Sequence, residues 1–285
     1  MKLRGWKMID GKTEIYGIIG NPVAHSLSPI MHNAAFFELG INAAYIPFAV
    51  TDLKSGLTGL KGLAVKGVSV TIPHKEGVIP FLDEIDPVAA SIGAVNTIVV
   101  QREETTARLL GSNSDWQGAN RALEDVISLS GRKVVILGAG GSARAMGFGL
   151  QAAGSEIILC SRTESRGRAL ADELSCPWCP LELAHGLKGD ILINGTSVGM
   201  EPDQDRTPVS GDFIASYKVV MDIVYAPLKT RLLEEAERLG CTTVNGLEML
   251  LYQGVVQFEL WTGRKAPISL MRQRLREAVE ARNRI

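Results

Sequence analysis

A lysine follows a strand-like run in the stretch "GVSVTIPHKE" at residues 67–76. Val68 and Val70 alternate with polar residues in the period-two pattern of a strand, and Pro73 ends that strand because it cannot donate to a ladder. In α/β proteins, ligands bind beside polar residues at the ends of strands. An ammonium group there is able to stabilise a developing negative charge or to deliver a proton, which makes Lys75 a candidate catalytic residue. The alternative is an ordinary solvated turn.

A glycine-rich segment, "VVILGAGGSARA", has the features of a phosphate site. Gly138, Gly140 and Ala143 have the spacing G-x-G-x-x-A, directly after an apolar strand and before a helix. The first glycine allows a tight turn, the second lets the backbone approach a pyrophosphate, and the alanine permits close helix packing. The helix N-terminus supplies N–H donors and a favourable dipole. The residues expected to contact a dinucleotide are Gly138, Ala139, Gly140, Gly141, Ser142 and Ala143.

The end of the next strand indicates which dinucleotide is bound. An NAD enzyme typically has Asp or Glu there, against the ribose hydroxyls. In this chain "EIILC" is followed by Ser161, Arg162 and Thr163, with Arg166 a little further on. A guanidinium group pairs well with a 2′-phosphate, so the segment predicts NADP. A solvated start of a helix is the alternative for both arginines.

Four more polar residues stand at the ends of predicted segments. Ser26 and Ser28 in "NPVAHSLSP" lie in a strand-to-helix loop, where two hydroxyls can bind a carboxylate. Asn96 in "GAVNT" and Asp115 in "GSNSDWQG" are also at segment ends. Each residue alone is explained as well by a turn or a cap, and we expect Ser28 to be the N-cap of the following helix.

Strand-like and helix-like segments alternate along the chain, which predicts parallel sheets with helices on their faces. The first series has expected strands over 14–20, 43–50, 67–72, 94–100 and 106–111, with helices over 28–40, from 51, and over 78–85. The second series has expected strands within 133–141, 156–163, 190–200 and 218–225, with helices ending near 153 and 174. The C-terminal part is helical over 246–263 and 269–282.

These elements predict two domains of the α/β class. The second series, which begins near Gly131, has the order of a Rossmann-type NADP-binding domain, and the first series is expected to form an α/β substrate domain. The C-terminal helices are expected to return to the first domain. The substrate domain would then comprise 1–115 and 247–285, and the NADP-binding domain 116–246.

The composition of the 285-residue chain favours a small-molecule ligand. Its 30 basic and 31 acidic residues are balanced and scattered, which gives no reason to expect a nucleic-acid partner. The sequence contains neither a signal-peptide core nor an apolar run long enough to span a membrane. We therefore expect a cytoplasmic protein with no membrane partner.

Four cysteines are too few for a disulfide framework in a chain of this length. Cys176 and Cys179 form a C-x-x-C pair, but a zinc site needs about four ligands and no second pair exists. Prolines flank the pair, and a redox motif would instead open a helix after a strand. We therefore predict no metal site.

The motifs together resemble the shikimate dehydrogenase family. They are "GNPVAHSLSP", "VSVTIPHKE", "IGAVNT", "GSNSDWQG", "GAGGSARA", "SRT", "INGTSVGM" and "NGLEMLLYQG", in order from about Tyr16 to Trp261. The resemblance implies that Lys75 and Asp115 form the catalytic pair. A ketone that accepts hydride from NADPH develops negative charge on its oxygen, which agrees with a lysine at this position.

The same resemblance assigns the remaining site residues. Ser26 and Ser28 would bind the substrate carboxylate, and Thr71, Asn96 and Gln253 the ring hydroxyls. Ser69 stands where bacterial members often have Asn, and Ser114 where Thr is usual. Gln253 shares a helix face with Gln257, and from that face it can reach a cleft. The substrate residues are then Ser26, Ser28, Ser69, Thr71, Asn96, Tyr225 and Gln253, and further cofactor residues are Thr196, Ile223 and Gly246, with Met200 and Tyr225 expected near the nicotinamide.

The expected activity is the reversible NADPH-dependent reduction of 3-dehydroshikimate to shikimate, by a monomer or homodimer. A quinate or quinate/shikimate dehydrogenase of the same fold is the nearest alternative. A catalytically silent NADP-sensing protein is another, but it would have lost Lys75, Asp115 or the serine pair, which this chain retains. The Ser69 variant also resembles the dehydrogenase half of fused dehydroquinase-shikimate dehydrogenases, so association with a dehydroquinase stays open.

Overall fold

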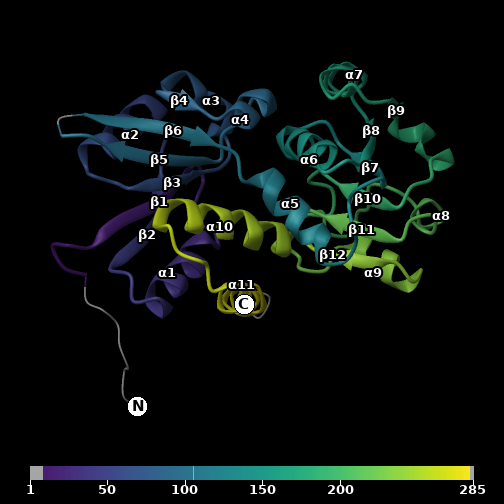
Figure 1. The fold of residues 1–285 in the computed structure, drawn as a ribbon. Helices are drawn as coiled ribbons and strands as arrows, with labels where there is room; N and C mark the ends of the chain where they lie inside the picture. The colour runs from purple at the N-terminus through teal and green to yellow at the C-terminus, as the bar shows by residue number, and fades with distance from the viewer. Residues whose placement is uncertain (1–8, 105, 283–285) are drawn as a thin grey trace, which may run out of the picture. The chain divides into compact units, whose positions relative to one another are not determined.

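The computed structural model of this chain describes residues 9–104 and 106–282. The chain forms two compact units. Figure 1 shows the fold, coloured from purple at the N-terminus to yellow at the C-terminus. Unit 1 contains Met1–Ser114 and Gly254–Ile285, and unit 2 contains Asp115–Gln253. The sequence had predicted boundaries between residues 115 and 116 and between residues 246 and 247. The two units instead divide between residues 114 and 115 and between residues 253 and 254. The difference arises because one long helix, α10 (Gly246–Thr262), begins in unit 2 and ends in unit 1.

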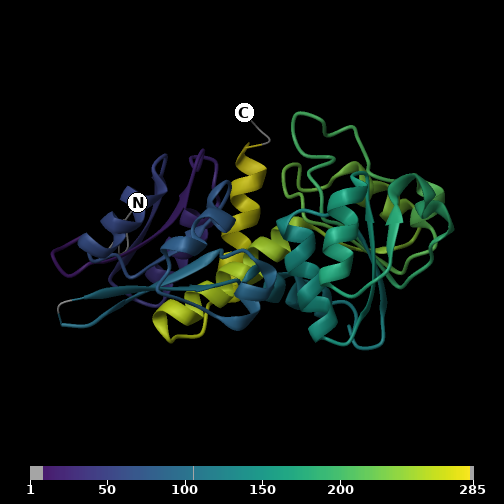
Figure 2. The same cartoon turned by 90° about the horizontal axis from the view of Figure 1, so that it is seen from above.

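Unit 1 is built on a mixed sheet of six strands. They are β1 (Glu14–Gly20), β2 (Ala43–Ala49), β3 (Gly67–Val70), β4 (Glu84–Ile85), β5 (Thr97–Arg102) and β6 (Ala107–Ser112). Their order in the sheet is β2-β1-β3-β5-β6-β4. β1 is parallel to β2 and β3, whereas β5 is antiparallel to β3 and to β6. The long hairpin of β5 and β6 is visible in Figure 2.

Helices cover both faces of this sheet. They are α1 (Ser28–Glu38), α2 (Leu53–Gly62), α3 (His74–Gly77), α4 (Pro87–Ile92) and α11 (Ile268–Arg282), with a 3₁₀ turn at Ile79–Phe81. α11 packs against α1, so the C-terminal helix returns to the first unit as the sequence predicted (Figure 1).

The alternation of β3 separates two cores, because successive residues of a strand point to opposite faces. Val68 and Val70 join an apolar core with Leu57 of α2. Ser69 points to the other face, where it is 4% exposed and bonds the hydroxyl of Tyr45 at 2.6 Å. That face also carries a cluster of aromatic rings, which comprises Tyr16, His32, Phe36, Tyr45, Phe258 and Trp261. The polar face of β3 therefore meets protein rather than water.

The start of α1 and the end of β3 differ from the expectation. Ser28 is the first residue of α1 and not its N-cap, because Leu27 occupies the N-cap position without a side-chain cap. β3 ends at Val70 instead of continuing to Ile72, whose side chain is 73% exposed. After Pro73 the chain forms the single-turn helix α3, in which His74 is buried and Lys75 is half-buried.

The helix expected over 78–85 is also wrong. Only the 3₁₀ turn Ile79–Phe81 forms there, and the chain then enters β4. The backbone N–H of Asp83 donates to the carbonyl of Leu109 on β6 at 2.9 Å, and the Asp83 carboxylate accepts from the N–H of the same residue at 2.6 Å. Pairing with the sheet thus replaces the hydrogen bonds that a helix would have made.

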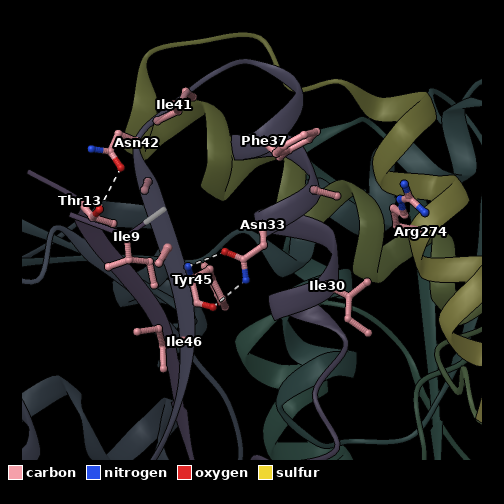
Figure 3. Close-up of a pocket in the computed structure, with 13 residues that line it drawn as sticks. Ile9, Thr13, Ile30, Asn33, Phe37, Ile41, Asn42, Tyr45, Ile46 and Arg274 are labelled. Carbon is pink, nitrogen blue, oxygen red and sulfur yellow. Dashed lines mark hydrogen bonds between the residues drawn. The ribbon is translucent and has the colours of Figure 1, made fainter. Parts of the chain in front are cut away.

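A side chain of α1 hydrogen-bonds the outer edge of the edge strand β2. The amide of Asn33 donates to the carbonyl oxygen of Tyr45 at 2.9 Å and accepts from its N–H at 2.8 Å (Figure 3). Two residues further along, Pro47 has no N–H to offer. The outer edge of β2 is therefore partly satisfied within the chain, which disfavours pairing with another strand.

Unit 2 is built on a parallel sheet of six strands. They are β7 (Lys133–Leu137), β8 (Glu156–Ser161), β9 (Trp178–Pro180), β10 (Ile191–Asn194), β11 (Val219–Asp222) and β12 (Thr242–Val244). Every pairing is parallel, and the order is β12-β11-β10-β7-β8-β9. The direction of strand addition reverses at β7, which is the switch point of a doubly wound Rossmann fold. The predicted fold class is confirmed.

The helices of unit 2 connect these strands. They are α5 (Asp115–Glu124), α6 (Gly141–Ala152), α7 (Glu164–Glu173), α8 (Gly211–Ile214) and α9 (Arg231–Arg238), with a 3₁₀ segment at Leu181–Gly186 and the first half of α10. Among the helices of the described residues, none combines the length and the apolar character needed to cross a bilayer.

Candidate active site

The turn after β7 requires glycine at its first position. Gly138 has φ +116°, and its N–H donates to the carbonyl of Cys160 on β8 at 2.7 Å. A β-carbon there would lie 2.9 Å from the side chain of Thr196 and 3.1 Å from the carbonyl of Gly195. Any larger residue would therefore be strained by both its backbone and its neighbours.

The next two glycines leave the N-terminus of α6 open. Gly140 is the N-cap and has no side-chain cap, and nothing lies within 4 Å of a β-carbon placed on Gly140 or Gly141. Ala143, in the first turn, is fully buried instead. The exposed N–H groups of this twelve-residue helix are available to an anion, as the sequence predicted for a phosphate.

A pocket of about 230 Å³ lies beside this turn. Eight of the residues predicted to bind cofactor line it: Gly138, Ala139, Gly140, Ser161, Arg162, Thr163, Arg166 and Thr196. Five predicted residues are not among its lining residues: Gly141, Ser142, Ala143, Ile223 and Gly246. The structure thus brings the glycine turn and the end of β8 together in one cavity.

A third arginine lines the same pocket and was missed by the sequence analysis. Arg206 lies in the loop after β10, beside Thr207 and Pro208, which also line the cavity. With Arg162 and Arg166 it makes the pocket strongly basic. No local sequence signal marks Arg206, because only the folding of a long loop brings it to the end of β8.

The hydroxyl of Ser161 shapes the loop after β8. It donates to the carbonyl of Thr163 at 3.1 Å and accepts from the indole N–H of Trp178 at 3.0 Å. Ser161 is buried, whereas Arg162 beside it is exposed. The small hydroxyl residue therefore fixes the turn from which the arginine projects.

A buried carboxyl organises the loops after β10 and β11. Asp222 is fully buried, and its oxygens accept from the amide of Asn194 at 3.0 Å, the N–H of Val224 at 3.0 Å and the hydroxyl of Thr230 at 2.7 Å. Asn194 in turn accepts from both the N–H and the hydroxyl of Thr196. Burial raises the pKa of Asp222 to about 6, although these hydrogen bonds lower it. Sequence analysis missed this network, whose only signal is a charged residue ending the apolar run "VVMD".

The start of α10 packs tightly against the end of β11. A β-carbon on Gly246 would collide with the carbonyl group of Ile223, so the two predicted cofactor residues are neighbours. Tyr225, two residues further along that loop, is half-buried. Gln253 is 8% exposed, and its amide donates to the carbonyl of Leu250 at 2.9 Å.

In unit 1 the two predicted carboxylate-binding serines are adjacent at the start of α1. The N–H of Ser28 donates to the hydroxyl of Ser26 at 3.3 Å. Ser28 is 3% exposed and also hydrogen-bonds the phenol of Tyr45, whereas Ser26 is half-buried. Two hydroxyls beside the first turn of a helix are a suitable environment for a carboxylate.

The residues predicted to bind ring hydroxyls lie at the ends of β3 and β5. Ser69 and Asn96 are buried, and Thr71 is half-buried. The strands are held in register by a bond of 2.8 Å from the N–H of Val70 to the carbonyl of Asn96. The structure therefore places Ser69 on β3 and Asn96 directly before the neighbouring strand β5.

Lys75 lies on α3 and is held by its backbone. Its carbonyl accepts from the N–H of Val95 at 2.8 Å. The neighbouring His74 is 8% exposed, and its Nε2 bonds the carbonyl of Val50 at 2.8 Å. Lys75 as a whole is half-buried. Asp115, its predicted partner, is the first residue of unit 2 and is 7% exposed.

Other features of the chain do not join this site. A pocket of about 620 Å³ lies between α1, β2 and α11, and none of the sequence-predicted residues lines it (Figure 3). Cys176 and Cys179 are not disulfide-bonded, and Cys179 lies in β9. Within residues 9–104 and 106–282, no three His, Cys, Asp or Glu side chains gather as a metal site would require.

Known protein families match three parts of the chain. Residues 18–98 match the shikimate dehydrogenase substrate binding domain, and residues 246–276 match the shikimate 5′-dehydrogenase C-terminal domain. Residues 133–195, which contain the glycine turn, match the coenzyme F420-dependent NADP oxidoreductase family.

Individual relatives are similar over nearly the whole length. The shikimate dehydrogenase (NADP(+)) of Moorella thermoacetica is 45% identical, over 96% of this chain and 96% of the relative. A crystal structure of shikimate dehydrogenase in complex with NADP+ is 42% identical with a TM-score of 0.89, over 95% of this chain and 98% of the other. The enzyme of Thermus thermophilus in complex with NADP(H) and shikimate is 38% identical with a TM-score of 0.85, over 93% of this chain and all of the other. The chain therefore belongs to the shikimate dehydrogenase family.

Proposed function

We propose that this chain catalyses the reversible NADPH-dependent reduction of 3-dehydroshikimate to shikimate. The observation that carries the proposal is the 45% identity to an NADP-dependent shikimate dehydrogenase over 96% of both chains. The basic pocket beside the glycine turn supports the choice of cofactor, because three arginines and no carboxylate line it. A cavity of this character suits the extra phosphate of NADP better than the ribose diol of NAD.

Unit 2 would bind the cofactor. The N-terminus of α6 and the glycine turn would hold the pyrophosphate, and Arg162, Arg166 and Arg206 would surround the 2′-phosphate. When bound, the nicotinamide supplies hydride to the substrate ketone. Ile223 and Gly246, with Tyr225 nearby, would border the nicotinamide ring.

Unit 1 would bind the substrate. Ser26 and Ser28 would bind the carboxylate, and Ser69, Thr71 and Asn96 would bind the ring hydroxyls. Gln253, from α10, is proposed for the same task. These groups carry no charge, so they bind substrate and product with similar strength and orient the ring for the reaction.

Lys75 would act on the reacting oxygen. Negative charge develops on the carbonyl oxygen as hydride arrives, and the ammonium group of Lys75 stabilises this charge and delivers the proton. Asp115 would hold the lysine and the neighbouring hydroxyl in place. In the direction of shikimate oxidation, the same lysine in its neutral form accepts the hydroxyl proton.

One assay of the purified chain tests this function against its alternatives. The reduction of NADP and of NAD is followed with shikimate and, separately, with quinate. We expect kcat/KM to be highest for the pair of shikimate and NADP. Comparable rates on quinate would indicate a quinate/shikimate dehydrogenase, and NADP binding without turnover would indicate a sensing protein. Either result would replace the proposed activity. We also propose a cytoplasmic monomer or homodimer, which light scattering and cell fractionation would examine.

A further inference from the structure

A buried chain of hydrogen bonds joins the start of α1 to the proposed hydroxyl-binding residues of unit 1. Gln257, on the half of α10 that belongs to unit 1, stands at its centre and is fully buried. Its amide oxygen accepts from the hydroxyl of Ser69 at 2.6 Å. Its amide nitrogen donates to the carbonyl of Asn96 at 3.1 Å and to the hydroxyl of Thr97 at 3.0 Å. No site role had been expected for Gln257.

The orientation of the Gln257 amide is fixed by one of these partners. The carbonyl of Asn96 can only accept, so the nitrogen of Gln257 must face it and the oxygen must face Ser69. Ser69 therefore donates its single proton to Gln257. The hydroxyl of Tyr45, 2.6 Å from that of Ser69, must then be the donor in their contact. Burial raises the pKa of Tyr45, which keeps the phenol protonated for this purpose.

The side-chain oxygen of Asn96 already accepts hydrogen bonds from within the protein. Its side-chain oxygen accepts from the N–H of Ser114 at 2.7 Å, the hydroxyl of Thr97 at 2.7 Å and the hydroxyl of Ser114 at 3.1 Å. An amide oxygen has two lone pairs, so this atom has no capacity left for a ligand. Asn96 can serve a ligand hydroxyl only as a donor, through its nitrogen.

Ser69, in contrast to Asn96, can only accept a hydrogen bond from a ligand. Its proton is given to Gln257, and one of its two lone pairs accepts from Tyr45. A ligand group that reaches Ser69 can therefore only donate to it. An alcohol satisfies both Ser69 and Asn96, since a hydroxyl donates and accepts at once. An ether or a ketone satisfies Asn96 alone, and a methylene group satisfies neither.

We propose that Gln257 is a positioning residue of the hydroxyl-binding wall, which comprises Ser69 and Asn96: Gln257 takes the proton of Ser69 and so leaves Ser69 an acceptor for a ligand, beside an Asn96 whose oxygen is already occupied. The wall then selects ligands that carry an alcohol at the facing ring position. This inference rests on the proposed function, because it assumes that the ring of shikimate meets these residues.

The experiment compares shikimate with its 4-deoxy and 5-deoxy analogues, which lack one of the two ring hydroxyls that do not react. Wild type and Gln257→Met are assayed with NADP. We expect kcat/KM for shikimate to fall about tenfold or more in the variant, because a bound hydroxyl loses an oriented partner. For one deoxy analogue the fall is expected to be much smaller, so that discrimination against that analogue drops about fivefold or more. KM for NADP should stay within about twofold.

Two further variants separate positioning from folding. Ser69→Ala removes the acceptor that Gln257 is proposed to orient, keeps the backbone of β3, and should reduce the same discrimination. Asn33→Leu is the matched control, since this amide bonds the backbone of Tyr45 on the outer edge of β2. It should lower the melting temperature without changing discrimination. Unchanged discrimination in both Gln257→Met and Ser69→Ala would overturn the inference, and Ser69→Ala decides if the first variant does not fold. A wild type inactive on shikimate would instead refute the proposed function itself.

Discussion

Replacing Asp222 by Asn is expected to remove a pH-dependent loss of stability. The carboxyl is fully buried, and burial raises its pKa from 3.8 to about 6. Between these two values the folded chain keeps a proton that the unfolded chain has released. The free energy of unfolding therefore falls as pH rises from about 4 to about 6 and is constant, for this group, above that range. The difference between the two pKa values corresponds to about 3 kcal/mol.

The substitution is designed to keep the hydrogen bonds. The amide oxygen of an Asn at this position can accept from Asn194 and Val224, and the amide nitrogen can donate to the hydroxyl of Thr230. Urea unfolding of wild type and variant between pH 4 and 8 measures the effect. Relative to the variant, wild type should lose about 3 kcal/mol between pH 4 and 7, most of it below pH 6.

A control variant acts in the opposite direction. Thr230→Val removes one donor to the carboxylate and should raise the pKa of Asp222 further, so that the loss with rising pH becomes larger. It should also lower stability at every pH, because Thr230 caps α9. Parallel stability curves for wild type and Asp222→Asn across pH 4 to 7 would refute the argument that burial controls this carboxyl.

Three further outcomes are expected. His32 is fully buried, its ring nitrogens have no partner among the described residues, and burial lowers its pKa to about 3. In acid unfolding, the free energy of unfolding of wild type should therefore fall by roughly 1.4 kcal/mol per pH unit below about 6.5, relative to His32→Leu. Arg162→Ala and Arg206→Ala should each raise KM for NADP about tenfold or more and change KM for NAD little in steady-state assays, and equal effects on both cofactors would contradict a phosphate-binding role. Lys75→Met should lower kcat by roughly two to four decades with a much smaller change in KM, and near-normal turnover in a folded variant that binds NADP would exclude Lys75 as the proton donor.

The cofactor turn could be predicted from the sequence because its requirements are local. Gly138 is needed for a positive φ and for close approach to Thr196, and both follow from the tight turn between β7 and α6. Arg162 follows directly after β8, so its place at the end of the strand was also predictable. Arg206 was not predictable, since its approach to the pocket depends on the course of a long loop.

The helix expected over 78–85 failed for a related reason. A short apolar run is compatible with a helix or a strand, and the local sequence does not decide between them. Hydrogen bonds to the sheet favour the extended conformation here, because the backbone and the carboxylate of Asp83 both bond Leu109 of β6. Similarly, the Asp222 network joins two loops that are separate in sequence, those after β10 and β11. A charged residue at the end of an apolar run only indicates that partners must exist.

The polar face of β3 shows how a sequence can indicate a contact between residues far apart in the chain. The alternation in "GVSVTI" correctly placed Ser69 opposite the apolar core, but the partner of Ser69 is Gln257, 188 residues away. A single window of sequence cannot identify that contact. Yet Gln257 interrupts the apolar run "GVVQF", and a buried amide, like a buried hydroxyl, requires a hydrogen-bonding partner. Isolated polar residues within two otherwise apolar elements are therefore candidates to meet one another, and a polar position in a core predicts a tertiary contact as well as a site.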